Sequence, residues 1–162
     1  MNKLEKDVLA IISDDSRLAP ARIATMLGAD IKEVEKAVSN LEKEKIIVKY
    51  TAIINTDAVE EELVEALIEV KVTPQRGSGF DTIAGEIAAH DEVKNLYLMS
   101  GAYDLAVIVQ GKSLRSVSRF VSEKISTYDS VISTATHFIL KKYKVEGADM
   151  KGGGDGRLSV QA

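Results

Sequence analysis

The chain has 162 residues, 45% of them hydrophobic and 28% charged, with a formal net charge of −4 and no cysteine. This composition predicts one or two folded domains, excludes a disulfide framework or a thiolate metal site, and argues against coating of nucleic acid by bulk positive charge. No apolar run reaches the length of a membrane span, and the start has acidic residues that a signal peptide lacks, so we expect a soluble cytoplasmic protein with no membrane partner.

The first predicted element is a helix that starts after Asn2. Asn2 and Glu5 have the spacing of a capping box, in which each side chain bonds the backbone N–H of the other residue. One apolar face follows at helical spacing, formed by Leu4, Val8, Ile11 and Ile12. The turn-forming stretch 13–16 then ends this helix.

Two further helices joined by a tight turn are predicted next. Pro20 suits the first turn of the earlier helix, and Gly28 stops it. The apolar stripe of this helix is Ile23, Met26 and Leu27. Asp30 with Glu33 repeats the capping-box spacing at the start of the later helix. Its apolar positions are Ile31, Val34, Val38 and Leu41.

The later helix leaves one polar face toward solvent, formed by Lys32, Glu35, Lys36, Ser39, Asn40 and Lys43. Two helices with this geometry form a helix-turn-helix, which presents its second helix to the major groove of DNA. Residues 46–54 then become β-branched and aromatic, which predicts a short two-stranded wing that carries Lys45 and Lys49. The first part of the chain is therefore predicted to be a winged helix-turn-helix.

DNA binding by this part of the chain would depend on local contacts, because residues 1–60 hold nine Lys and Arg against eleven Asp and Glu. Lysine mainly binds phosphate, and asparagine pairs with adenine through two hydrogen bonds. The candidate DNA-binding residues are Lys32, Lys36, Ser39, Asn40, Lys43 and Lys49. The alternative is an ordinary solvated face whose lysines pair with neighbouring glutamates.

A polar, acidic stretch at 55–62 is the expected linker to a second domain. Beyond it, apolar residues alternate with polar ones from Val64 to Val72, which predicts a strand that Pro74 ends. A helix follows, with Ser78 and Asp81 as candidate caps. Its apolar face is Phe80, Ile83, Ala84 and Ile87.

Three strands and one helix complete the second domain. Strands are expected at 93–99, 105–109 and 131–142. The helix before the last strand has Leu114, Val117, Val121 and Ile125 as its inward positions. The order βαββαβ predicts a ferredoxin-like domain and an α+β fold for the whole chain. The expected domain limits are 1–54, 55–62 for the linker, 63–145 for the second domain, and 146–162 for a glycine-rich flexible tail.

The predicted strands carry apolar residues on both faces, although two helices can cover only one face of the sheet. Examples are Tyr97 opposite Leu96, and Ile108 opposite Val107. A large exposed apolar patch is unusual in a soluble monomer, so we expect a homodimer joined through the sheets. In the alternative, the protein is a monomer whose winged domain or tail covers that face. A dimer would present two recognition helices to a pseudo-palindromic site.

The assembled pattern resembles the leucine-responsive and asparagine regulators, the Lrp/AsnC family. The resemblance spans about residues 2–144 and rests on the segments LAPARIATMLG, VSNLEKEKII, KYTAIIN and MSGAYDLAVIV. It implies a transcription regulator that assembles as dimers and often as octamers, and that binds an amino-acid effector near a Gly-x-x-Asp turn. Lys36 stands here where similar members have an arginine, and Lys45 stands where they have a glycine.

The turn in question contains Gly101 and Asp104. These residues suit an ordinary tight turn, or a loop whose N–H groups bind a ligand carboxylate while the Asp104 carboxylate binds an ammonium group. The resemblance favours the ligand site. Its candidate residues are Met99, Ser100, Gly101, Tyr103 and Asp104, with Thr134 and Thr136 as weaker candidates.

No cofactor, metal ion or catalytic residue is predicted. The two histidines, His90 and His137, lack the spacing of a metal site. Phosphate-binding, nucleophile-elbow and zinc-protease motifs are missing from the sequence. Two alternative functions remain open, a sirohaem-decarboxylase-like enzyme of the same fold and a partner subunit that has lost DNA binding.

Overall fold

The computed structural model describes residues 1–59, 63–74, 76–77 and 79–150. The chain divides into two compact units, Met1–Ala52 and Ile53–Ala162, and each is described by itself. The sequence-based limits of the domains and linker stay predictions. In the described ranges, no helix is long and apolar enough to cross a membrane.

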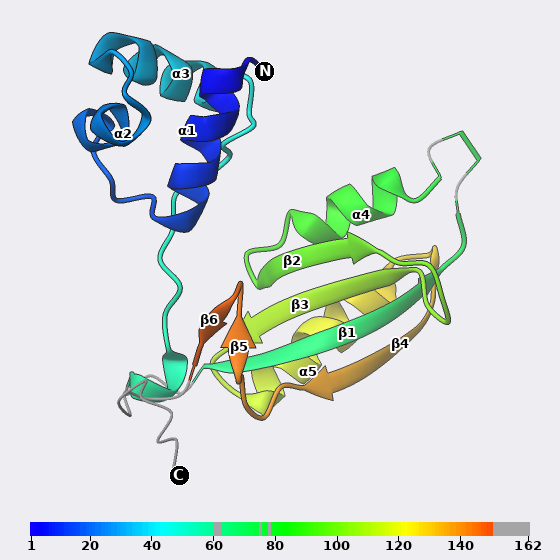
Figure 1. Cartoon of the computed structure of the whole chain (residues 1–162). Helices are drawn as coiled ribbons and strands as arrows, with labels where there is room; N and C mark the ends of the chain where they lie inside the picture. The colour runs from blue at the N-terminus through cyan, green and yellow to red at the C-terminus, as the bar shows by residue number, and fades with distance from the viewer. Residues whose placement is uncertain (60–62, 75, 78, 151–162) are drawn as a thin grey trace, which may run out of the picture. The chain divides into compact units, whose positions relative to one another are not determined.

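The first unit consists of three helices, α1 (Lys3–Asp14), α2 (Pro20–Leu27) and α3 (Ile31–Lys43) (Figure 1). The Asn2–Glu5 capping box is present at the start of α1, as predicted. Pro20 occupies the first turn of α2, and Gly28 ends that helix with φ 62°, a left-handed conformation that glycine adopts without steric cost. The predicted helix-turn-helix is therefore confirmed.

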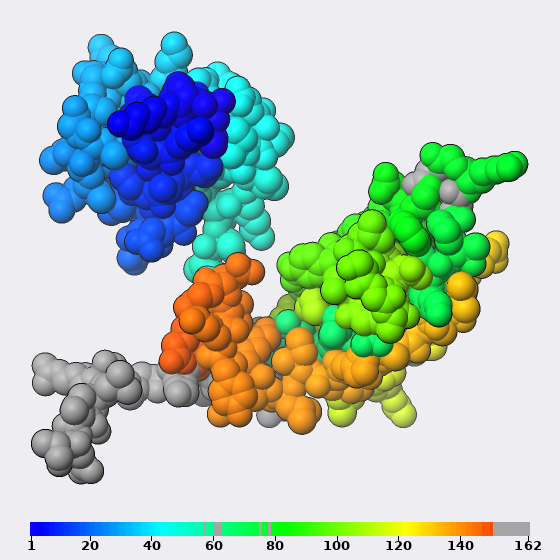
Figure 2. All heavy atoms as spheres, turned by 45° about the vertical axis from the view of Figure 1, so that its right-hand side comes forward, coloured from blue at the N-terminus to red at the C-terminus, as the bar shows by residue number. Residues whose placement is uncertain are grey.

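The core of the first unit lies where the three helices meet, and Figure 2 shows the atoms of α1 packed directly against those of its two neighbours. Its buried side chains are Val8, Ile12, Ile23, Ala24, Val34, Ala37 and Leu41. Met26, a predicted core residue, is 54% exposed. The small residues Ala24 and Ala37 are buried instead, and small side chains let packed helices approach one another closely.

The predicted two-stranded wing is not formed, because residues 46–54 contain no strand. Lys45 adopts a left-handed conformation with φ 58°. The backbone N–H groups of Ile46 and Ile47 then both bond to the carbonyl of Leu41, at 2.9 and 3.0 Å. The chain thus folds back onto the end of α3 and continues in extended form. An isolated two-stranded ribbon gains little stability by itself, which explains why this short segment does not pair.

The second unit is a four-stranded antiparallel sheet with two helices on one face (Figure 1). The strand order is β2-β3-β1-β4, the ferredoxin-like arrangement that the sequence predicts. The elements are a 3-10 turn η1 (Thr56–Ala58), β1 (Val64–Val72), α4 (Asp81–Ala88), β2 (Val93–Leu98), β3 (Leu105–Gly111), α5 (Leu114–Glu123), a 3-10 turn η2 (Ile125–Thr127) and β4 (Val131–Phe138).

Three details of the second unit differ from the prediction. Leu114 is 56% exposed, and Phe120 takes its place in the core at 5% exposure. Val117, Val121 and Ile125 are buried as predicted, so the apolar stripe keeps its face but begins one turn later than predicted, and Phe120 adds to it. Asp81 is the first residue of α4 rather than its cap, and Phe80 at the N-cap position makes no side-chain capping bond, while the other candidate cap, Ser78, lies outside the described residues. The last strand ends at Phe138 rather than at residue 142.

The expected flexible tail begins with ordered structure. Two short strands, β5 (Lys144–Val145) and β6 (Ala148–Asp149), pair as a hairpin. Met150 is buried beside this hairpin, and its backbone N–H bonds to the carbonyl of Tyr143 at 3.0 Å. The remainder of the expected tail, 151–162, lies outside the described residues.

The sheet face turned away from the helices is mixed in character. Both helices pack on the face that carries the buried residues of β1 and β3, and α5 lies behind the strands in Figure 1. The opposite face has an apolar centre formed by Leu67, Tyr97, Ala106, Ile108 and Ala135. The Glu69 side chain also lies on this face, and its Oε1 is 3.4 Å from Nε2 of His137. The expectation of strands that are apolar on both faces is therefore only partly correct, since the outward positions of β1 are mostly charged.

Candidate functional site

The candidate DNA-binding side chains lie mainly on one face of α3. Lys32, Lys36, Ser39 and Lys43 are spaced by four, three and four residues, which places them in one row. We call these four residues the polar row of α3. The three lysines are exposed and Ser39 is half-buried. The described residues contain no ion pair to these lysines, so the alternative of a face paired by neighbouring glutamates receives no support.

The start of α3 is fixed by one side-chain cap. Asp30 Oδ1 accepts a hydrogen bond from the backbone N–H of Lys32 at 2.8 Å. The reciprocal bond from Glu33 that a capping box requires is not formed. Asp30 alone therefore satisfies a free N–H group at the N-terminus of α3. This bond fixes the start of the helix at the residue just before the polar row.

Asn40 takes part in a contact between helices, rather than extending the polar row. Its Nδ2 donates to Glu5 Oε1 at 3.2 Å, while Glu5 Oε2 accepts the backbone N–H of Asn2 at 2.8 Å. Glu5 is buried, and the backbone N–H of Asn2, followed by the amide of Asn40, lowers the pKa of its carboxyl group. Asn40 thus has a structural partner in α1, and readout of a base by Asn40 stays a prediction.

Lys45 lies in the left-handed turn that follows α3, and Lys49 lies on the segment beyond it; both are exposed. The hydroxyl of Tyr50 donates to Glu42 Oε1 at 3.0 Å and ties this segment to the end of α3. Because no wing forms, Lys49 is not held on a paired strand, and its contact with DNA stays a prediction.

The candidate effector residues of the Gly-x-x-Asp turn lie together in the β2–β3 connection. Met99, Ser100 and Gly101 are exposed, and Tyr103 is half-buried. Asp104 Oδ2 accepts the backbone N–H of Val72 at 2.9 Å, and the Met99 N–H bonds to the Asp104 carbonyl at 2.8 Å. Asp104 therefore helps to hold the connection against β1 with one carboxylate oxygen.

Thr134 and Thr136 do not join this turn within one chain. They lie on β4 opposite Val70 and Ile68 of β1, and β1 separates β4 from β3. Neighbouring strands are about 4.8 Å apart, so the threonines are on the order of 10 Å from the strand that begins with the turn. A ligand that contacts both the turn and the threonines of one chain would have to span about two strand spacings. Otherwise the threonines would have to come from a second copy of the chain.

Both histidines have structural partners. His90 Nε2 lies 2.9 Å from the hydroxyl of Tyr128, and its ring meets Phe120 edge-on at 5.3 Å. His137 pairs with Glu69. In the part of the chain that the structure describes, no group of three His, Cys, Asp or Glu residues can hold a metal ion.

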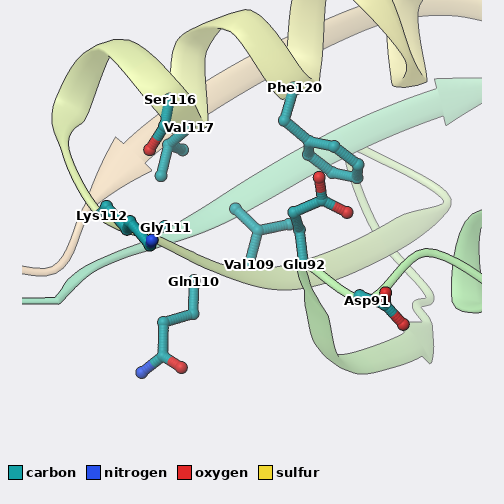
Figure 3. Close-up of a pocket in the computed structure, with 9 residues that line it drawn as sticks. All are labelled: Asp91, Glu92, Val109, Gln110, Gly111, Lys112, Ser116, Val117 and Phe120. Carbon is teal, nitrogen blue, oxygen red and sulfur yellow. The ribbon is translucent and has the colours of Figure 1, made fainter.

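Sequence reasoning missed two features of these surfaces. It identified Glu5 as a cap but not as a partner of Asn40, because the two residues are 35 positions apart. It also missed a cavity of about 350 Å³ in the second unit, between the α4–β2 turn and the β3–α5 turn (Figure 3). No local motif announces this cavity, since it depends on how the two turns meet.

Comparisons with known proteins match both units. The profile described as Lrp/AsnC ligand binding domain matches residues 65–149, and the profile described as winged helix-turn-helix DNA-binding matches residues 1–48. An uncharacterized HTH-type transcriptional regulator of Bacillus subtilis, YugG, is 48% identical over 99% of this chain and 97% of its own length. Another, from Pyrococcus furiosus, is 31% identical over 86% of this chain and 91% of its own length.

Solved structures show the same fold. A transcriptional regulator of Neisseria meningitidis in complex with L-Met has a TM-score of 0.71 and 18% identity, over 90% of this chain and 93% of that one. AsnC of E. coli has a TM-score of 0.68 and 19% identity, over 90% and 95% of the two chains. At this level of identity the likeness concerns the fold alone.

Proposed function

The chain belongs to the Lrp/AsnC family of DNA-binding transcription regulators, and from this premise we propose that α3 enters the major groove and that a small effector, an amino acid, controls the response. The observation that carries the DNA part is the exposed polar row of α3, with three lysines on one helical face. Its lysines bind phosphates on either side of the groove, and Ser39 lies between them, where a helix approaches base edges.

The unit that binds DNA is a homodimer joined through the open face of the sheet. Support comes from the apolar centre of that face, where Tyr97 is 51% exposed in the single chain. Burial of such a patch is favourable by roughly 25 cal/mol per Å² of apolar surface. The Glu69–His137 pair lies on the same face, and Glu69 sits between Ala106 and Ala135 on the central strand, so the dimer interface has to accommodate this pair within its apolar centre. Dimers of this kind assemble further into tetramers or octamers, as the family resemblance implies.

The effector site is the connection between β2 and β3. Asp104 Oδ2 is occupied by the Val72 N–H, and the second carboxylate oxygen is available for an ammonium group. The exposed backbone at 100–102 offers N–H groups to a carboxylate. The L-Met complex of the Neisseria regulator supports an amino acid as the chemical class. Thr134 and Thr136 lie opposite Val70 and Ile68 on the helix-covered side of the sheet, so a dimer joined through the open face does not bring them to this turn, and the proposed site does not include them.

An effector acts by binding one assembly or DNA-bound state more tightly than another. The test is a selection of bound sequences from random duplex DNA, carried out with and without pooled amino acids. We expect enrichment of a pseudo-palindromic sequence, and a change in enrichment when amino acids are added. Recovery of unselected DNA under both conditions would contradict the proposal.

A further inference from the structure

The cavity between the α4–β2 turn and the β3–α5 turn has the character of a small-molecule site (Figure 3). Its volume of about 350 Å³ falls within the range of roughly 300 to 1,000 Å³ that is usual for ligand pockets. Three apolar side chains form its floor, namely Val109, Val117 and Phe120. These side chains are at most 5% exposed, so the cavity reaches into the core of the unit.

Charged side chains stand around this apolar floor. Asp91 and Glu92 come from the α4–β2 turn, and Lys112 comes from the β3–α5 turn. In Figure 3 the Glu92 carboxylate points toward the ring of Phe120, whereas the Asp91 carboxylate points away from the floor. Glu92 is half-buried, and the described residues provide it with no ion pair. A half-buried carboxylate on an apolar wall is stabilised by a cation that enters the same space.

The local backbone holds this arrangement in place. The N–H of Gln110 bonds to the carbonyl of Glu92 at 2.9 Å, which joins the two turns at the end of the sheet. Ser113 and Ser116 form a capping box at the start of α5, with bonds of 3.0 and 3.1 Å. The N-terminus of α5 is therefore already capped, and Glu92 is the carboxylate of the described lining residues that can recognise a ligand beside the floor.

We propose that this cavity binds a small primary amine with an apolar side chain, whose ammonium group lies against Glu92 and whose hydrocarbon part lies on the apolar floor. A free amino acid and a simple alkylamine share this chemistry, and Lys112 provides a counter-charge for a carboxylate if one is present. The site is separate from the proposed effector turn, because the two lie at opposite ends of β3, about 20 Å apart at 3.4 Å per residue.

The test uses the full-length protein without DNA and three related probes. These are 3-methylbutylamine, L-leucine and 4-methylpentanoate, which carry the same branched chain with an ammonium group, with both charged groups, and with a carboxylate. Binding is followed by calorimetry or ligand-detected NMR. We expect one or both amines to bind and 4-methylpentanoate to bind at least about tenfold more weakly, because it lacks the charge-assisted bond. Binding that is no weaker for 4-methylpentanoate, or no binding of either amine, would overturn the proposal.

Two matched variants locate the binding. Glu92→Gln keeps the shape of the side chain and removes its charge, and we expect it to weaken binding of the amine about tenfold or more. Glu86→Gln makes the same change on the exposed face of α4 outside the cavity, and binding should stay within about twofold of the wild type. Thermal unfolding of both variants checks the fold. Equal effects of the two substitutions would overturn the location of the site.

The variant Lys112→Ala distinguishes a free amino acid from a simple alkylamine as the natural ligand class. If the natural ligand class is a free amino acid, this variant weakens the binding of L-leucine and leaves the binding of 3-methylbutylamine unchanged. If it is a simple amine, the wild type binds 3-methylbutylamine more tightly than L-leucine. Both results support the cavity as an amine site. Binding of L-leucine that is unaffected by Glu92→Gln would instead assign it to the effector turn, so this inference would fail while the proposed function stands.

Discussion

Asn40 Nδ2 donates a hydrogen bond to Glu5 Oε1 at 3.2 Å, so that α3, the proposed DNA-reading helix, is joined to α1 by side chains 35 positions apart. The other oxygen of Glu5 is held by the backbone N–H of Asn2. Asn40 lies at the edge of the polar row, four residues after Lys36, so the bond holds α3 beside the row while the three lysines of the row remain exposed. The orientation of the recognition helix thus depends on a buried carboxylate at the beginning of the chain.

Replacement of Asn40 by Ala removes one partner of the buried Glu5 carboxylate. We expect the free energy of unfolding of the first unit to fall by about 1.5 to 3 kcal/mol, the usual contribution of a hydrogen bond to a charged group. Urea denaturation followed by circular dichroism measures this loss. Ser39→Ala, one residue away and on the polar row, should change stability by about 0.5 kcal/mol or less. Unchanged stability in Asn40→Ala would show that the contact with Glu5 contributes nothing.

Glu5 also predicts an acid-side loss of stability. Its pKa is lowered in the folded protein, first by the Asn2 N–H and then by the Asn40 amide. The contribution is therefore fully present above the unfolded pKa of about 4.3, and it is lost as the pH falls through the lower folded value. Thermal midpoints of the wild type and Glu5→Gln, measured from about pH 6 to pH 3, should converge on acidification. A constant difference across this range would contradict the assignment.

The polar row predicts salt-dependent DNA affinity. Lys36→Ala and Lys43→Ala should each weaken binding to all duplex sequences and reduce the slope of log affinity against log salt by about one. Fluorescence anisotropy titrations at several salt concentrations measure both quantities. Lys94→Ala, an exposed lysine of the second unit, is the control and should leave the slope unchanged. If the α3 variants behave like Lys94→Ala, their lysines do not contact phosphate.

The open sheet face predicts the oligomeric state. Tyr97→Asp places a charge in the apolar centre of that face and should convert dimers to monomers at micromolar concentration. Tyr97 is exposed in the single chain, so its replacement should leave the fold intact. Leu140→Asp is the matched control, because Leu140 is 95% exposed and lies beyond the end of β4. Sedimentation velocity distinguishes the two variants, and a dimer that persists in Tyr97→Asp would place the interface elsewhere.

Local patterns were sufficient to predict most of the fold. The capping box at Asn2, the left-handed stop at Gly28 and the alternation along β1 each depend on neighbouring residues, and each is present in the structure. The order of elements then restricted the second unit to one sheet topology. Periodicity was less successful at the end of a helix, and on α5 it included Leu114 in the buried face and left out Phe120. Leu114 occupies the first position of the helix, from which its side chain points into solvent.

The candidate sites were harder to predict, because they depend on contacts between distant segments. The wing was predicted from residue types at 46–54, although strand pairing requires a partner that the sequence pattern does not guarantee. The Asn40–Glu5 bond depends on how α1 crosses α3. The cavity beside Glu92 depends on the register that pairs Val93 with Val109 and brings two turns together. No alternation of apolar and polar residues encodes these arrangements.

Site-specific cross-linking tests most directly whether α3 reads DNA. The chain has no cysteine, so Ser39→Cys creates a single attachment point for a photo-activated cross-linker in the centre of the polar row. Lys94→Cys in the second unit is the control. We predict that residue 39 cross-links to a selected duplex, at two symmetric half-sites separated by about one helical turn, and that residue 94 does not. Failure of residue 39 to cross-link to a duplex that the labelled protein still binds would contradict the account.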